Sequence, residues 1–375
     1  MVLAPHPDDE SLATGCVLQN AACVGAAIRV VFITDGENNP WAQRATERRW
    51  RIGEGERLRW GARRRDESFA ALAALGVDAS SARFLGFGDQ SLTEHLGDES
   101  GSALRRRLSE EIANLKPTVL FMPCVHDQHP DHSATSVLAH LALIGRRSPA
   151  PPPRTFQYAV HAANGTPPGA VCAVVPSEAE RLAKRSAILC HTSQLTLRRK
   201  GLLRFADRPE SFALGLEPSP RSVAGPLRLL DAEPGRWTFA LRASARIALG
   251  GTRLLLISHA DRGGAILPVP ISPWPSSRAL RRAGCGEALG QVRTSWERRE
   301  LRVTVTAPHL RVDGRCFAKL DVTRQRRMGF FDLWPWMSFG QWPAQAPRLE
   351  HWPSTSAARD PAATRVEEYS PAPAR

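Results

Sequence analysis

The first half of the chain alternates short apolar runs with longer amphipathic segments. Strands are expected at residues 1–4, 28–34, 83–85, 118–123, 155–160 and 170–175, and helices at residues 11–26, 66–75, 104–115, 132–144 and 177–190. Strands and helices that alternate in this order form a parallel sheet covered by helices. The pattern therefore predicts an α/β domain over residues 1–220. Residues 37–65 are expected to form a partly helical excursion over one edge of the sheet.

The second half of the chain has a different pattern. Residues 237–242 and 301–306 alternate apolar and polar side chains, and residues 254–258 and 265–269 are short apolar runs. Such segments are typical of an antiparallel sheet. We expect a smaller β-rich domain over residues 221–346. Residues 347–375 are rich in Pro, Ala, Ser and Arg and are expected to be disordered. Four tryptophans are expected to pack the two domains together: Trp334, Trp336, Trp342 and Trp352.

Composition limits the class of protein. The 375 residues are 42% hydrophobic and 23% charged, as in globular proteins. The net charge of +13 favours nucleic acid, anionic lipid or acidic glycoconjugates as partners, although a general preference for Arg explains it equally well. The seven cysteines form no C-x-x-C pair, and no signal peptide or membrane span is recognisable. We therefore expect a cytoplasmic protein without a transmembrane segment.

Candidate chemistry begins where the first predicted strand gives way to the first helix. His6, Asp8, Asp9 and Glu10 lie within a single turn there. Open parallel sheets bind ligands at this position. Two or three carboxylates in one turn repel each other unless a cation or a helix N-terminus offsets their charge. The segment therefore indicates a divalent metal site, with plain capping of the helix as the alternative.

A second group of polar residues follows the predicted strand at residues 118–123. His129, Asp131 and His132 stand at the start of the next helix. Three protein ligands and one open position are typical of catalytic zinc, and two histidines with one aspartate supply them. Taken alone, an H-x-x-H pair is more often two surface histidines. Because both groups lie at strand ends, we favour one shared metal site.

These residues carry a resemblance to a known family. His6-Pro7-Asp8-Asp9-Glu10 and His129-Pro130-Asp131-His132 resemble the A-H-P-D-D-E and H-P-D-H motifs of the LmbE-like (PIG-L) N-deacetylases. Weaker matches extend the resemblance to about Gln194: Thr34-Asp35-Gly36-Glu37, Arg64-x-x-Glu67, Leu85-Gly86-Phe87-Gly88-Asp89 and His191-Thr192-Ser193-Gln194.

The resemblance implies a Rossmann-like catalytic domain and a role for each motif residue. Zinc would be bound by His6, Asp9 and His132, with Fe(II) as the alternative metal. Asp8 would be the general base. A protonated His129 would stabilise the oxyanion, and Asp131 would hold the His129 ring. Arg64 and Asp89 would contact the sugar or an anionic group on it, and His191 would line the cleft.

The resulting hypothesis is a zinc-dependent hydrolase that removes an acyl group, expected to be acetyl, from an amino sugar or glycoconjugate. Amide hydrolysis of a thiol conjugate stays open. The rival is a basic, non-catalytic module that binds nucleic acid or anionic glycans through the Arg-rich segment (residues 44–65) and the tryptophans. The sequence also departs from the family pattern, because Met1 leaves a short first strand and no tyrosine precedes the second motif. It does not indicate an oligomeric state.

Overall fold

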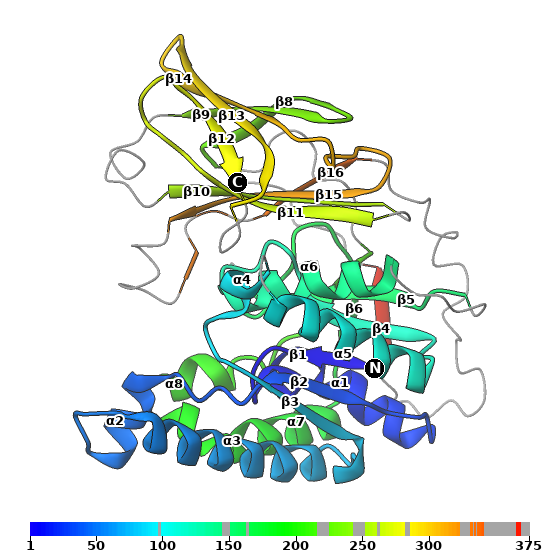
Figure 1. Cartoon of the computed structure of the whole chain (residues 1–375). Coiled ribbons are helices and arrows are strands. Elements are labelled where there is room, and N and C mark those ends of the chain that lie inside the picture. The colour runs from blue at the N-terminus through cyan, green and yellow to red at the C-terminus, as the bar shows by residue number, and fades with distance from the viewer. Residues whose placement is uncertain are drawn as a thin grey trace.

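The computed structural model describes residues 1–96, 99–144, 151–162, 165–215, 225–242, 252–260, 263–281, 286–322, 331–332, 334, 336–340 and 365–368. The chain forms an α/β part (residues 1–215) and a β-rich part (residues 225–340), which lie one above the other in Figure 1.

A mostly parallel sheet organises the α/β part, in the strand order β17-β6-β7-β5-β4-β1-β2-β3. Its strands are β1 (Val2–Ala4), β2 (Val30–Thr34), β3 (Ala82–Phe87), β4 (Val119–Pro123), β5 (Arg154–Tyr158), β6 (Ala170–Val175), β7 (Glu210–Leu214) and β17 (Arg365–Glu368). Strands β1 to β5 pair in parallel, and Val2 pairs with both Val30 and Phe121. The chain order therefore reverses between β1 and β4, and such a switch point opens a crevice at the carboxyl ends of the strands.

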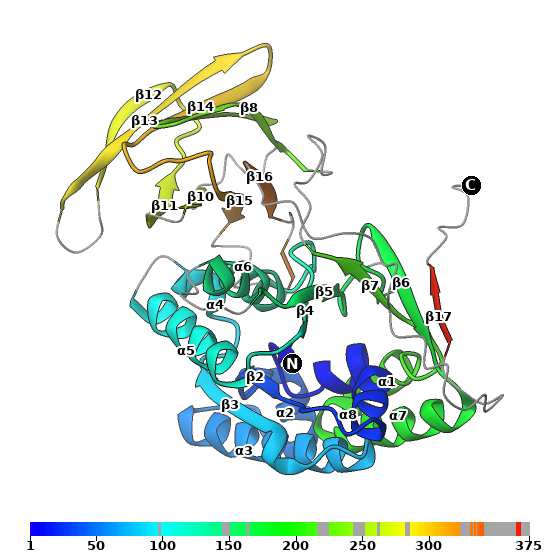
Figure 2. The same ribbon diagram turned by 90° about the vertical axis from the view of Figure 1, so that its right-hand side faces the viewer.

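Helices cover both faces of this sheet, as Figure 2 shows. One face carries α1 (Asp9–Cys23), α3 (Glu54–Ala74), α7 (Glu178–Cys190) and α8 (Thr192–Leu203), with α2 (Pro40–Glu47) packed on α8. The other face carries α4 (Leu92–His95), α5 (Glu99–Leu115) and α6 (Pro130–Ile144). A short 3-10 helix, η1 (Ala79–Ser81), precedes β3. Alternate residues of each strand enter opposite cores, so Val2 packs on the α1 side and Leu3 on the α6 side.

The β-rich part consists of two antiparallel sheets that enclose a core of their own. One sheet contains β11 (Gly263–Pro270), β10 (Thr252–Ala260), β15 (Arg315–Val322) and β16 (Met337–Gly340). The other contains β12 (Ser276–Arg281), β13 (Ala288–Glu297), β14 (Glu300–Thr306), β9 (Arg236–Arg242) and β8 (Leu227–Glu233). The inward side chains of β9 and β14 alternate with outward polar ones, which confirms the predicted antiparallel pattern.

The two parts share a hydrophobic core along α6. Leu255, Ile257, Phe317 and Trp336 of the β-rich part join the core that α5 and α6 form on the sheet. Trp336 is fully buried and confirms the prediction for that residue, whereas Trp334 packs against the core inside the β-rich part. Trp342 and Trp352 lie outside the described residues.

Two segments differ from the expectation. Helical residues 40–47 and 54–65 confirm the partly helical excursion expected there, but the helix expected from residue 66 already begins at Glu54, where Gly53 and Glu56 cap it. Its first turns carry many arginines and therefore lack a clear apolar stripe. In the segment expected to be disordered, residues 365–368 form β17 on β6, and the rest lies outside the described residues. None of the described helices is long and apolar enough to cross a membrane.

Candidate metal centre

The first motif forms the turn between β1 and α1, at the switch point of the sheet. Asp8 is the N-cap of α1 and has a φ of 129°, a region that residues other than glycine rarely adopt. The His6 N–H donates to Asp9 Oδ2 at 2.9 Å, and the Asp9 N–H donates to the His6 carbonyl. The strained turn directs Asp8 and Asp9 toward the same space as His6.

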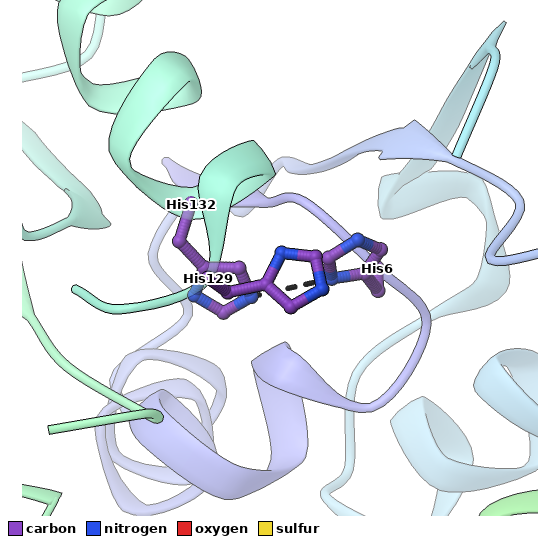
Figure 3. Close-up of side chains that lie close together, drawn as sticks. All are labelled: His6, His129 and His132. Atoms are coloured by element: carbon purple, nitrogen blue, oxygen red, sulfur yellow. Dashed lines mark hydrogen bonds between the residues drawn. The ribbon is translucent and has the colours of Figure 1, made fainter. Parts of the chain in front are cut away.

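The second motif lies at the neighbouring strand end, where β4 leads into α6. Pro130 is the first residue of α6, and the His129 carbonyl accepts the Ser133 N–H. Figure 3 shows His129 and His132 extending from this helix start toward His6. The expected convergence of the two motifs is therefore present in the structure.

Three donor atoms meet where the motifs converge. His6 Nδ1 lies 3.2 Å from His132 Nε2, His132 Nε2 lies 3.2 Å from Asp9 Oδ2, and Asp9 Oδ2 lies 3.4 Å from His6 Nδ1. Ligands at zinc bond lengths of about 2.0–2.1 Å in a tetrahedron are separated by roughly 3.3–3.4 Å. All three side chains are buried. The residues present therefore fit a tetrahedral divalent cation with one further position available.

Carboxylates contact the second ring nitrogen of each candidate histidine ligand, His6 and His132. Asp89 Oδ1 lies 3.1 Å and Asp131 Oδ2 lies 3.4 Å from His6 Nε2, and Asp127 Oδ2 lies 3.3 Å from His132 Nδ1. Burial lowers the pKa of His132, but Asp9 and Asp127 outweigh burial and raise it to about 9. Carboxylates in this position orient a metal-bound imidazole and increase its basicity.

Asp131 does not hold the His129 ring with its carboxylate, which corrects the expectation. The Asp131 carboxylate accepts the N–H groups of Gln90 and Leu92, while the Asp131 N–H donates to His129 Nδ1 at 3.2 Å. The physical reason is that the N–H groups of Gln90 and Leu92, at the start of α4, occupy the carboxylate, and the Asp131 N–H, at the start of α6, has no partner within its helix.

His129 also differs from the protonated state that was expected. Burial and the neighbouring His6, His132 and His161 hold the pKa of His129 well below its usual value. Because Nδ1 accepts a hydrogen bond, the neutral ring carries its proton on Nε2. His129 is therefore a neutral hydrogen-bond donor.

Asp8 lies beside a buried arginine. Burial, with a smaller contribution from Asp9, raises the pKa of Asp8 to about 6 although Arg64 opposes the shift. Arg64 Nη2 lies 3.4 Å from Asp8 Oδ1 and donates to the Pro7 carbonyl, while Nη1 donates to the Gly36 carbonyl at 2.9 Å. A carboxylate with a pKa near neutrality is suited to accept a proton and return it.

A cavity of about 370 Å³ opens over these groups. Its lining includes His6, Asp8, Asp9 and His129, and also the predicted substrate residues Arg64 and Asp89. His191 does not line the cavity. The His191 side chain is buried, and its Nε2 lies 3.0 Å from Glu10 Oε1. The contact with Glu10 therefore keeps the His191 ring away from the cavity.

Asp127, His161 and Phe331 are among the residues of the site that were not predicted. Asp127 Oδ2 accepts the N–H groups of Val160 and His161, and Oδ1 accepts that of His129. Asp127 thus connects the loop after β5 to the loop of the second motif. The His161 ring lies 4.9 Å from that of His132. The pairing of β5 with β4 brings His161 to the site, and the contact of Asp332 with Gln128 brings Phe331 there, so spacing along the chain marks neither residue.

Known proteins are similar to the N-terminal part of this chain. The family model PIG-L, described as GlcNAc-PI de-N-acetylase, matches residues 1–143. The 1D-myo-inositol 2-acetamido-2-deoxy-α-D-glucopyranoside deacetylase of Mycolicibacterium gilvum is 33% identical over 158 residues, which cover 37% of this chain and 51% of that protein. The deacetylase of the same name from Nakamurella multipartita is 30% identical over 235 residues, which cover 51% of this chain and 78% of that protein. The chain belongs to the PIG-L (LmbE-like) deacetylase family.

Both motifs lie within the residues that the PIG-L family model matches, which confirms the resemblance seen in the sequence. The chain spans about half the length of the first of these relatives. Among solved structures, a conserved protein from Thermus thermophilus aligns with 27% identity and a TM-score of 0.43, over 59% of this chain and 98% of that protein. The β-rich part lies beyond the residues that the PIG-L model covers.

Proposed function

We propose that this chain is a metal-dependent N-deacylase that hydrolyses the amide of an N-acylated amino sugar or glycoconjugate. The observation that carries the proposal is the convergence of His6, Asp9 and His132 at 3.2–3.4 Å, with Asp8 and His129 facing the same cavity. Membership of a family of deacetylases supports it.

Zinc is the proposed metal, and its ligands would be His6, Asp9 and His132. Two histidines and one carboxylate also suit Fe(II), so the identity of the metal is part of the test. When bound, such a cation acidifies water and polarises an amide carbonyl.

Asp8 is the proposed general base because Asp9 is committed to the metal. Its carboxylate would take a proton from the attacking water as the water oxygen bonds to the carbonyl carbon. Asp8 would then return this proton to the nitrogen as the C–N bond breaks, which releases a carboxylate and a free amine. Arg64 would hold Asp8 in place through the contact at 3.4 Å.

His129 would stabilise the negative charge that develops on the carbonyl oxygen. Its Nε2–H is held in position because the Asp131 N–H fixes Nδ1. Removing one such donor in comparable sites lowers kcat by about 10²–10³-fold.

Polar side chains in the cavity fit the sugar. Asn39, Asp89, Gln90 and Gln194 line the cavity together with Arg64. Hydroxyl groups that enter a protein site need hydrogen-bond partners, and these side chains supply both donors and acceptors. The named relatives act on an acetamido sugar linked to inositol, which suggests N-acetylglucosamine conjugates as first substrates to test.

The test is an amine-release assay with N-acylated amino sugars and with each candidate metal. Asp8→Asn is expected to lower kcat by about 10²–10⁴-fold while metal content is unchanged, because the base is lost and the ligands remain. Equal rates for Asp8→Asn and the parent would remove Asp8 as the base. Failure of every amide to release amine would refute the hydrolase and favour the anion-binding module.

A further inference from the structure

The β-rich part contributes a side chain to the cavity over the metal centre. The Phe331 ring lies 5.2 Å from the ring of His161 and 6.2 Å from that of His129, and Phe331 lines the cavity. The side chain is 43% exposed, so packing inside the β-rich part does not account for its position. A large apolar side chain left open to a cavity marks a place where an apolar ligand group can bind.

Two contacts hold Phe331 at this position. The Asp332 N–H donates to the carbonyl of Gln128 at 2.8 Å, directly before the second motif. The Asp332 carboxylate pairs with Lys319 of β15, whose side chain is 1% exposed. The backbone next to Phe331 is therefore connected both to the metal-binding loop and to the sheet of the β-rich part.

Hydrogen-bonding side chains of the cavity lining gather toward one end of the strand order. On the β2 and β3 side, the lining includes Asn39, Asp89 and Gln90, with Trp41 and Ala42 next to Asn39. On the β4 and β5 side, Val160 and Phe331 present apolar surface beside His161. The metal ligands lie between the two sides, where β1 and β4 are neighbours.

An N-acylated amino sugar also has two different arms, one on each side of its amide. The sugar arm needs hydrogen-bond partners, and the acyl arm gains free energy from contact with apolar surface. We propose that Phe331 and Val160 form an acyl subsite, which selects apolar N-acyl groups longer than acetyl. This inference rests on the proposed N-deacylase function and adds to it the class of acyl group.

The experiment measures kcat/KM for glucosamine N-acylated with acetyl, butanoyl, hexanoyl and octanoyl groups. The parent is expected to prefer hexanoyl over acetyl by at least tenfold, since each buried methylene contributes about fourfold. Phe331→Ala is expected to lower this hexanoyl-to-acetyl ratio about tenfold, and Phe331→Leu to restore most of it. Trp274→Ala is the matched control, because Trp274 is an exposed aromatic residue of the β-rich part that does not line the cavity.

The possible outcomes separate this inference from the proposed function. A parent that releases amine but prefers acetyl, or a Phe331→Ala variant with the parent's ratio, overturns the acyl subsite and leaves the deacylase intact. A second series with methyl and benzyl glycosides of N-acetylglucosamine tests the opposite orientation. If Phe331→Ala changes the benzyl-to-methyl ratio and leaves the acyl ratio unchanged, the ring contacts the aglycone and the inference is wrong.

Discussion

Asp8 illustrates how single residues combine strain and charge at this site. It caps α1 with a φ of 129° and has a pKa raised to about 6 because it is buried next to Asp9. Unfavourable backbone angles cost about 1–3 kcal/mol and persist where the surroundings impose them. Arg64 supplies part of that restraint through Asp8 and the Pro7 carbonyl.

Because Gly36 has no side chain, Arg64 can pack directly against its backbone. This contact gives a prediction for a single residue. A Cβ at Gly36 would lie 1.9 Å from Arg64 Nη1, and the residue has a φ of +63°. Gly36→Ala is therefore expected to displace Arg64 and lower kcat at least tenfold, as measured by amine release. Gly25→Ala is the control, since Gly25 has a φ of +66° and nothing within 4 Å of the added carbon.

Gly25→Ala should cost about 1–2 kcal/mol in unfolding free energy, which is the strain of a left-handed alanine, without changing kcat. If the two variants showed the same kcat, the contact between Gly36 and Arg64 would have no role in placing Asp8.

The sequence predicts residues that belong to compact motifs and misses those that the fold assembles. His6 and His132 were found because each motif places several chemical groups within a few residues. Asp127 stands next to the second motif, but its bonds to the loop after β5 are not visible in the sequence. Phe331 carries no signal, because its place depends on the β-rich part reaching β4, which spacing along the chain does not encode.

Helix α1 shows how elements are stabilised away from the cavity. Thr14 has non-helical angles that interrupt α1. The Glu210 carboxylate on β7 accepts the N–H groups of Cys16 and Val17 and pairs with Lys184 on α7 at 2.6 Å. Both side chains of this pair are 1% exposed. One buried carboxylate therefore connects α1, α7 and β7.

Glu210→Gln is expected to destabilise the fold by about 3–5 kcal/mol, because it leaves the Lys184 ammonium buried without its counter-charge. Urea unfolding measures the change. Glu178→Gln removes an exposed pair with Arg181 and should leave the midpoint unchanged. An equal, small shift in both variants would show that the buried pair contributes little.

The ends of a helix can be predicted well where its hydrophobic period and its capping residues are clear in the sequence. Helix α7 has the capping residues Ser177 and Glu180, and the predicted range of 177–190 is close to the observed one. Helix α3 was expected twelve residues too late, since arginines occupy its first turns and glycines stand at residues 55 and 61. Gly61 packs close to Asp35 and Glu37, so tertiary contact outweighs its poor helix propensity.

At the scale of the whole molecule, the two parts are joined by an apolar contact along α6. His140 of α6 is fully buried there, 6.2 Å from the ring of Phe317 on β15. The predicted β-rich character of the second half came from alternation along single strands. The part of Trp336 in the contact was predicted, but α6 was not predicted as the other side, because α6 is buried on nearly all sides and its pattern does not distinguish sheet from partner.

His140 gives a pH prediction at this scale. Burial holds the pKa of His140 well below its usual value, and the positive charge of Arg315 lowers it further. The neutral ring therefore contributes stability above about pH 6.5, and this stability is lost as the pH falls below that value, by up to about 1.4 kcal/mol per unit. His140→Gln should show a smaller loss between pH 6.5 and 5 in urea unfolding. The same slope in both proteins would contradict a buried neutral imidazole at the contact.

Part of the positive charge is paired on the α/β surface. Arg49 pairs with Glu56, Arg59 with Glu47 and Arg65 with Asp35. These ion pairs give much of the Arg-rich segment an ordinary charged surface. Arg64, from the same run, is buried at the candidate site.

The central claim is that two distant strand ends bind one cation, and elemental analysis of protein purified without chelator tests it most directly. The account predicts about one zinc or iron per chain in the parent and in Asp8→Asn, and a loss of the metal in His6→Ala and His132→Ala. A parent without metal, or a His132→Ala variant that retains the parent's full content, would contradict the account.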